Sequence, residues 1–256
     1  MREFLGFGGY SRAPEGYFSW QHVTFVTSLI LLAVLLAVFL GLRNRKRSEK
    51  EKNRVLIIGA ILIDLFEIFK ITILCLRSHS TDAILHNLPL FLCSIQLITL
   101  PLAAFAKGRV KEAALDLVSI FGVLGMVLGT YGAGQNYGAY PVLSLDNVVS
   151  GITHSISGFA AIYIMVAGMA SLKRSNIVIS YIILLAFCAA AYGVNRWIGY
   201  NYMFLMNHDG TPYVIVWNLV KGSKLWYPIA VVVLFLIYIT LFYLVCFLLR
   251  KKKKNA

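Results

Sequence analysis

Charged residues are scarce in this sequence. They make up 14% of the 256 residues, whereas soluble domains usually contain roughly 25%. Hydrophobic residues make up 59%, which argues against a soluble fold. The formal net charge is nevertheless +13. Because the basic residues bracket long apolar runs and do not interleave with a globular pattern, membrane topology explains them better than nucleic-acid binding does.

Sequence motifs for metals, disulfides and export are also lacking. The four cysteines, Cys75, Cys93, Cys188 and Cys246, have no CxxC spacing and lie in or beside apolar runs, which excludes a zinc motif or a disulfide framework. The first nineteen residues contain no signal-peptide core, and the first apolar run is long enough to be a retained helix. No cofactor and no metal are predicted.

Apolar runs of about 20 residues can each cross a hydrocarbon core of about 30 Å as a helix. Seven such runs are present. They lie at residues 20–42, 55–76, 87–106, 113–133, 148–171, 177–199 and 227–249. The sequence therefore predicts an all-α fold, a single transmembrane domain over residues 1–256 with seven spanning helices.

The distribution of Lys and Arg predicts the orientation of these helices. Of the 24 basic residues, 17 fall in the segments that follow the first, third, fifth and seventh predicted helices. The side of a membrane protein that is rich in Lys and Arg faces the cytoplasm. We therefore expect the N-terminus outside, the C-terminus in the cytoplasm, and a location in the cell membrane.

A cysteine and a histidine lie at matching depths in this arrangement. Cys93 and His154 are each about six residues, roughly 9 Å, from the outer ends of their predicted helices. A thiolate is a nucleophile, and a neighbouring imidazole can accept its proton. The pair is therefore predicted to be catalytic, passing acyl chains between phospholipids and lysophospholipids through a thioester. The alternative is that Cys93 only packs, as most membrane cysteines do.

Further polar residues at membrane depth are predicted to bind the substrate, because ionisable groups in hydrocarbon are costly. Gln96, Asn195 or Ser94 could donate to an oxyanion, and Arg196 or Lys70 could hold a phosphate. The full set is His22, Glu67, Lys70, Gln96, Asn195, Arg196, Asn201 and Tyr202.

Three other functions are considered for the polar residues and the seven-helix topology. A transporter or a lipid-binding protein would line its pocket with Asp64, Glu67 and Lys70, although Glu67 and Lys70 could equally form an ion pair that holds the helices. A zinc site is a further possibility, with the ligands His22, Cys93 and His154. A retinal photoreceptor is excluded, because it needs a Schiff-base lysine and the seventh predicted helix has none.

Four segments resemble the YwaF family of bacterial integral membrane proteins, which is related to the eukaryotic transmembrane protein 164. They are FSWQH (18–22), LPLFLCS (88–94), the pair His154–Ser155, and NRWIGYNYMFL (195–205). The resemblance implies a seven-helix fold in the bacterial plasma membrane. It also implies cysteine-dependent phospholipid acyl transfer with Cys93 as nucleophile and His154 as base. The family pattern has a histidine where this chain has Phe91.

Overall fold

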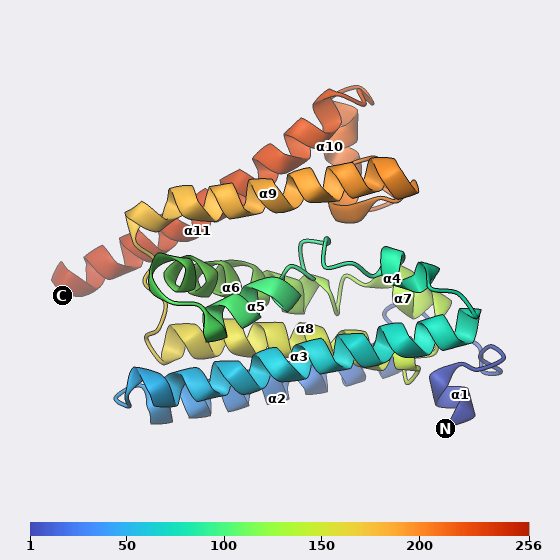
Figure 1. Ribbon diagram of the computed structural model, residues 1–256, viewed down its shortest axis with the longest axis horizontal. Coiled ribbons are helices and arrows are strands. Elements are labelled where there is room, and N and C mark those ends of the chain that lie inside the picture. The colour runs from blue at the N-terminus through green and yellow to red at the C-terminus, as the bar shows by residue number, and fades with distance from the viewer. Residues whose placement is uncertain (256) are drawn as a thin grey trace. The chain divides into compact units, whose positions relative to one another are not determined.

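The computed structural model describes the backbone of residues 1–255 and the side chains of residues 1–249 (Figure 1). All regular secondary structure in this part of the chain is helical. The helices are α1 (Arg2–Leu5), α2 (Trp20–Asn44), α3 (Glu49–Ser78), α4 (Asp82–His86), α5 (Gln96–Phe105), α6 (Gly108–Leu128), α7 (Gly134–Ala139), α8 (Leu145–Val166), α9 (Arg174–Ile198), η1 (Tyr202–Phe204), α10 (Val214–Leu219) and α11 (Trp226–Asn255). They belong to two compact units. The prediction of one transmembrane domain over residues 1–256 stays a prediction.

Unit 1 comprises Met1–Pro89 and Gln96–Ser171. In it α8 packs against α2, α3 and α6, and α5 packs against α3 and α6 (Figure 1). Seven of the fifteen core residues are alanine, which allows the close van der Waals packing that holds helices together in lipid. The core residues are Ala37, Leu56, Ala60, Ile63, Leu100, Ala103, Ala104, Ala114, Leu115, Val118, Ala160, Tyr163, Ile164, Ala167 and Met169.

Serine side chains begin three of the helices in unit 1. Ser19 accepts a hydrogen bond from the His22 backbone at the start of α2. Ser48 and Glu51 form a capping box at the start of α3, and Ser144 caps α8. Each cap satisfies backbone N–H groups that have no partner inside the helix. The caps lie one, seven and four residues before the helix starts expected from hydropathy.

Unit 2 comprises Leu90–Ile95 and the chain from Leu172 onward. The long helices α9 and α11 pack against each other, and the Ser180 hydroxyl lies 3.2 Å from the Tyr243 hydroxyl in their contact. Between these helices the chain forms η1 and the short helix α10, which packs against α11. Apart from η1 and α10, the residues between α9 and α11 are not helical.

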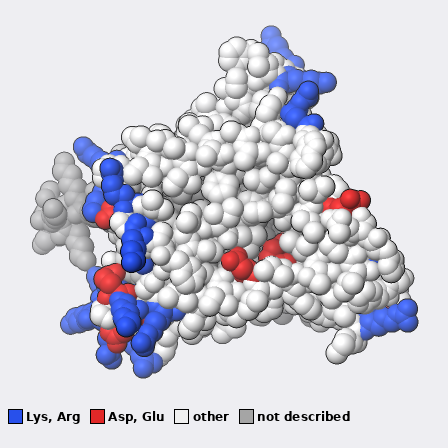
Figure 2. Space-filling view, in the orientation of Figure 1, with Lys and Arg blue, Asp and Glu red and all other residues white. Residues whose placement is uncertain are grey.

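Among the residues that the structure describes, four helices are long and apolar enough to cross a membrane: Trp20–Asn44, Leu145–Val166, Arg174–Ile198 and Trp226–Leu249. Charged side chains gather mainly at the ends of helices (Figure 2). The 30 residues of α3 are also long enough to cross, but they include several charged residues. The predicted number of seven crossings and the orientation of the termini remain predictions.

The third predicted helix is wrong over its first half. Residues 87–106 were expected to be helical throughout, but the helix α5 begins only at Gln96. Pro89 disfavours helical dihedral angles at the preceding Leu88, and Ser94 stabilises a local turn through its hydrogen bonds to the backbone of Phe91. A hydropathy pattern does not register either effect.

Candidate functional site

His154 lies in α8 and turns one ring nitrogen back onto its own helix. Its Nδ1 is 2.7 Å from the carbonyl oxygen of Ser150 and 3.4 Å from the Ser150 hydroxyl. Because a carbonyl oxygen can only accept, this bond assigns the proton to Nδ1 and the lone pair to Nε2. The backbone thus selects the tautomer in which Nε2 can take up a proton, as a general base must.

The backbone at Gly129, immediately after α6, makes room for this imidazole. A Cβ atom at Gly129 would lie 1.8 Å from Cδ2 of His154 and 2.1 Å from its Nε2. The ring therefore occupies the space that any side chain at position 129 would need. The observed ring position requires glycine there, for reasons of space alone, because the Gly129 backbone is right-handed.

The structure changes the depths that the sequence suggested for the catalytic pair. Since α8 begins at Leu145, His154 lies nine residues into its helix, or roughly 14 Å. Cys93 lies in a turn, so helix rise assigns it no depth. The matched-depth argument was therefore wrong in its premise, because it assumed that both residues lay in uninterrupted helices.

Cys93 is half-buried in unit 2, in the turn Phe91–Ile95. The Ser94 hydroxyl accepts a hydrogen bond from the Phe91 N–H at 3.0 Å and donates to the Phe91 carbonyl at 3.2 Å. The Ile95 N–H also donates to that carbonyl, at 3.0 Å. These bonds fix the backbone on both sides of Cys93.

Aromatic side chains of unit 2 surround this turn. The Phe91 ring lies 4.9 Å from that of Tyr202, 5.9 Å from that of Phe204 and 6.1 Å from that of Tyr200, between centroids. Phe91, which stands where the family pattern has histidine, therefore acts here as an apolar anchor. Burial raises the pKa of Tyr213 to about 12, with smaller contributions from Tyr227 and Cys93. A thiol in such apolar surroundings needs a base to become a nucleophile.

Asn195 and Asn201, both predicted to bind substrate, organise the loop after α9. Asn195 is buried and brackets the backbone of Tyr202, accepting from its N–H at 2.6 Å and donating to its carbonyl at 3.0 Å. Asn201 accepts from the Met206 N–H at 2.8 Å and donates to Asp209 at 2.6 Å. Tyr202 itself is fully buried. The structure thus gives these polar groups partners within their own loop.

We expect Asn195→Asp to loosen this loop. Aspartate keeps the acceptor for the Tyr202 N–H but sets a second acceptor against the Tyr202 carbonyl, and unsatisfied buried groups cost roughly 1–3 kcal/mol. Hydrogen exchange at the amides of residues 202–206 should become faster. Asn218→Asp, at an exposed position in α10, is the matched control. Equal exchange in the two variants would show that the bracket does not hold the loop.

Gln96 and Arg196 differ in burial. Gln96 is fully buried at the start of α5, and its Oε1 accepts from the Thr99 hydroxyl at 3.0 Å. Within the described side chains, its Nε2 has no hydrogen-bond partner. A buried amide donor in this state usually has a water or ligand partner. Arg196 is exposed near the end of α9.

The charged residues of α3 pair with each other. Lys70 Nζ lies 2.6 Å from Glu67 Oε1, and both side chains are largely buried. Asp64 is half-buried one turn earlier. The structure therefore shows the ion pair that the sequence left as one of two possibilities for Glu67 and Lys70, with both charges on one helix.

His22 is fully buried and has partners at both ring nitrogens. Nδ1 accepts from the Phe18 N–H at 3.1 Å, and Nε2 lies 3.2 Å from the Thr130 carbonyl. Its ring also stacks on Tyr137, with centroids 3.8 Å apart. Neither nitrogen can then bind zinc, and the described side chains contain no group of three His, Cys, Asp or Glu placed to hold a metal.

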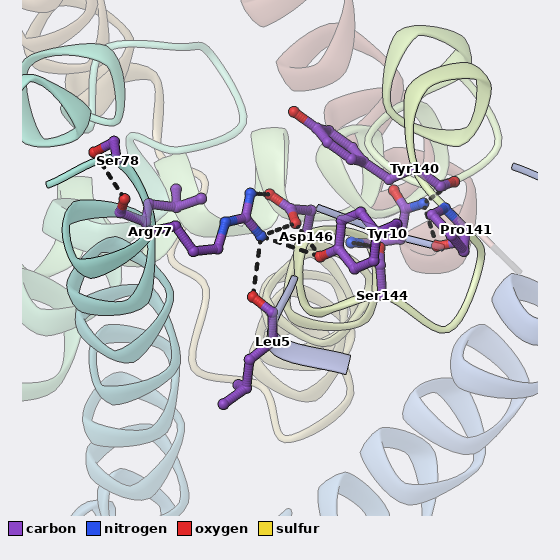
Figure 3. Close-up of polar contacts among 10 residues, drawn as sticks. Leu5, Tyr10, Arg77, Ser78, Tyr140, Pro141, Ser144 and Asp146 are labelled. Carbon is purple, nitrogen blue, oxygen red and sulfur yellow. Dashed lines mark hydrogen bonds and ion pairs between the residues drawn. The ribbon is translucent and has the colours of Figure 1, made fainter. Parts of the chain in front are cut away.

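A buried ion pair in unit 1 was missed by the sequence analysis (Figure 3). Arg77, at the end of α3, donates to Asp146 near the start of α8 over 2.7 Å and 3.4 Å. The Tyr10 hydroxyl donates to the same carboxylate at 2.6 Å, and Arg77 also donates to the carbonyl of Leu5 at 3.3 Å. Burial and the hydrogen bond to Asp146 raise the pKa of Tyr10 to about 12.

This network holds the N-terminal segment against the long helices of unit 1. Farther along the segment, Glu15 accepts from the Val142 N–H at 2.7 Å, and the Tyr17 hydroxyl donates to the Tyr131 carbonyl at 2.7 Å. Opposite charges at the ends of two long apolar helices were the available signal.

Comparison with known proteins identifies one family. The model of the TMEM164 family matches residues 17–248, which include α2 through most of α11. No match was found among curated proteins or among solved structures.

Proposed function

Because this chain belongs to the TMEM164 family, we propose that it transfers acyl chains between membrane phospholipids through a thioester on Cys93, with His154 as the base. The chain is an integral, multi-pass membrane protein, as its family and its four long apolar helices indicate. The resemblance to bacterial YwaF proteins supports a place in the bacterial plasma membrane.

The orientation of His154 is the observation that carries this proposal. A general base must present a lone pair, and the tautomer assigned here places that lone pair on Nε2 of His154. The Ser150 carbonyl holds the proton on Nδ1, and Gly129 leaves space for the ring. A carbonyl behind the imidazole is also how many functional histidines are oriented.

The proposed reaction has two balanced steps. Cys93, deprotonated by His154, attacks a phospholipid ester carbonyl; the carbon–oxygen bond breaks, and the lysophospholipid leaves with the proton from His154. A lysophospholipid hydroxyl then attacks the thioester, gives its proton to His154 and releases the thiolate, which is reprotonated. The Gln96 Nε2, a buried donor without a partner among the described side chains, is a candidate for stabilising the oxyanion.

An acyl-exchange assay tests this function. Purified protein in nanodiscs receives a phospholipid with deuterated acyl chains and an unlabelled lysophospholipid, and mass spectrometry measures the labelled product. We expect no product from Cys93→Ala and a loss of roughly 10²–10⁴-fold from His154→Ala. Cys246→Ala, in α11, is the control and should keep full activity. Activity that survives Cys93→Ala would contradict the thioester mechanism.

We also propose seven crossings with the N-terminus outside. The 10 residues of α5 rise only about 15 Å, so the third crossing would include the non-helical residues 87–95. Non-helical backbone at membrane depth is tolerated only where protein or water covers it, and such interrupted crossings form binding sites in transporters. Cys93 lies in this segment.

Reporter fusions test this topology. We expect a reporter inserted after Ser48 to lie in the cytoplasm, because Ser48 belongs to a segment rich in Lys and Arg. A reporter inserted after Asp209 should lie outside. The same cellular side for both insertions would contradict the proposed topology without affecting the thioester test.

A further inference from the structure

An apolar groove lies between α10 and α11 in unit 2. It has a volume of about 430 Å³ and is open to the surface. Val216 and Leu219 of α10 form one wall, and Ile229, Val233 and Ile237 of α11 form the other. Every lining side chain is aliphatic or aromatic. The walls are almost entirely apolar, so the groove suits a hydrocarbon chain.

The groove matches one leaflet in length. Its α11 wall runs from Trp226 to Ile237, which corresponds to roughly 16 Å of helix rise. One leaflet of a hydrocarbon core is about 15 Å thick. Because Trp226–Leu249 is a candidate membrane span with only 22% of its most apolar window buried, the groove opens on a helix suited to contact lipid.

The α10 wall is held in a defined position. The Trp217 ring lies 5.0 Å from that of Tyr227 at the start of α11, between centroids. A Cβ at Gly222 would lie 3.3 Å from the Trp217 indole, so the chain passes close to this ring. Gly222 has a positive φ of 68°, a backbone conformation that favours glycine. The contacts of Trp217 with Tyr227 and Gly222 therefore hold α10 beside α11 and maintain the groove between them.

Two lysines lie in the chain beside the Trp226 end of the groove, because they fall between the lining residues Val220 and Trp226. Lys221 and Lys224 are exposed in the short connection between α10 and α11. The one acid of the loop between α9 and α11, Asp209, accepts a hydrogen bond from Asn201 at 2.6 Å. Two lysines at the end of an apolar groove of leaflet length complement the headgroup and the acyl chain of an anionic phospholipid.

We propose that this groove binds one anionic phospholipid of the leaflet at the Trp226 end of α11. An acyl chain lies between α10 and α11, and the phosphate contacts Lys221 and Lys224. The lipid is bound at this site and not merely part of the surrounding bilayer. The site does not use Cys93 or His154, so it stands whether or not the chain transfers acyl groups.

Photocrosslinking of the full-length protein in nanodiscs tests the site. The probe is phosphatidylglycerol with a diazirine in one acyl chain, diluted into phosphatidylcholine, and labelled peptides are mapped by mass spectrometry. Ala230→Trp fills the groove. Leu241→Trp is the matched control, because Leu241 lies three turns farther along nearly the same face of α11 and outside the groove. Circular dichroism and gel filtration verify that both variants fold.

We expect labelling concentrated on residues 216–220 and 229–237, lost in Ala230→Trp and kept in Leu241→Trp. Unlabelled phosphatidylglycerol should compete better than phosphatidylcholine. Replacing both lysines by glutamine should reduce that preference by roughly fivefold per lysine. Labelling spread evenly along α11, labelling unchanged by Ala230→Trp, or equal competition by the two lipids would overturn the proposal.

Discussion

Replacing Gly129 with alanine is expected to reduce acyl transfer as severely as replacing His154 itself. The new Cβ would lie 1.8 Å from the imidazole, so the ring must leave its position and give up its bond to Ser150. Loss of a positioned base costs roughly 10²–10⁴-fold in rate. Overpacking should also destabilise the fold by roughly 1–3 kcal/mol. The acyl-exchange assay and thermal unfolding in detergent measure the two effects.

Two further variants separate this contact from a general effect of losing glycine. Gly193→Ala in α9 adds a Cβ that meets nothing within 4 Å, so its stability should be unchanged or slightly higher. In the double variant Gly129→Ala/His154→Ala the clash with the ring is gone, and the part of the destabilisation that the ring causes should disappear. The approach of the new Cβ to the Gly125 carbonyl oxygen, at 2.6 Å, remains. A full and additive loss of stability in the double variant would show that the ring does not occupy this space.

The second large effect is expected at the ion pair between Arg77 and Asp146. Arg77→Met should destabilise the protein by roughly 3–5 kcal/mol, because it leaves a buried carboxylate without its cation. The two side chains are only 17% and 11% exposed, so solvent screens them little. Release of the N-terminal segment should accompany this loss, since Arg77 also bonds Leu5 and Tyr10. Thermal unfolding and proteolysis of residues 1–19 measure both consequences.

The controls for this prediction use a distant arginine and the partner residue. Arg196→Met, at an exposed position, should change stability by less than about 0.5 kcal/mol. The double variant Arg77→Met/Asp146→Leu removes both charges and should recover much of the loss. If Arg77→Met unfolds at the same temperature as Arg196→Met, the pair does not stabilise the fold.

Long apolar runs allowed much of the helical architecture to be predicted from the sequence. Six of the seven predicted ranges contain a long continuous helix in the structure, including α2, α8 and α9. A run of about 20 apolar residues that crosses a bilayer must satisfy its own backbone hydrogen bonds, and a helix does so within one segment. The range 87–106 was misjudged, since Pro89 and the hydrogen bonds of Ser94 act locally on the backbone. Hydropathy alone also missed the short helix α10.

The candidate site was less predictable, because polar groups are defined by their partners. The sequence could not show that Asn195 and His22 make their hydrogen bonds to nearby backbone groups. Nor could it show that Arg77 pairs with Asp146, since the two residues are distant in sequence. His154 was identified by residue type, whereas its tautomer and the role of Gly129 required coordinates.

The central claim is that Cys93 carries an acyl group during turnover, and intact-mass analysis of the purified protein tests it most directly. After incubation with phospholipid, we predict a mass gain of one acyl group, located on the peptide that contains Cys93, removed by hydroxylamine and absent from Cys93→Ala. His154→Ala should form this adduct far more slowly. No acyl adduct after incubation with phospholipid, or an adduct that persists in Cys93→Ala, would contradict the claim.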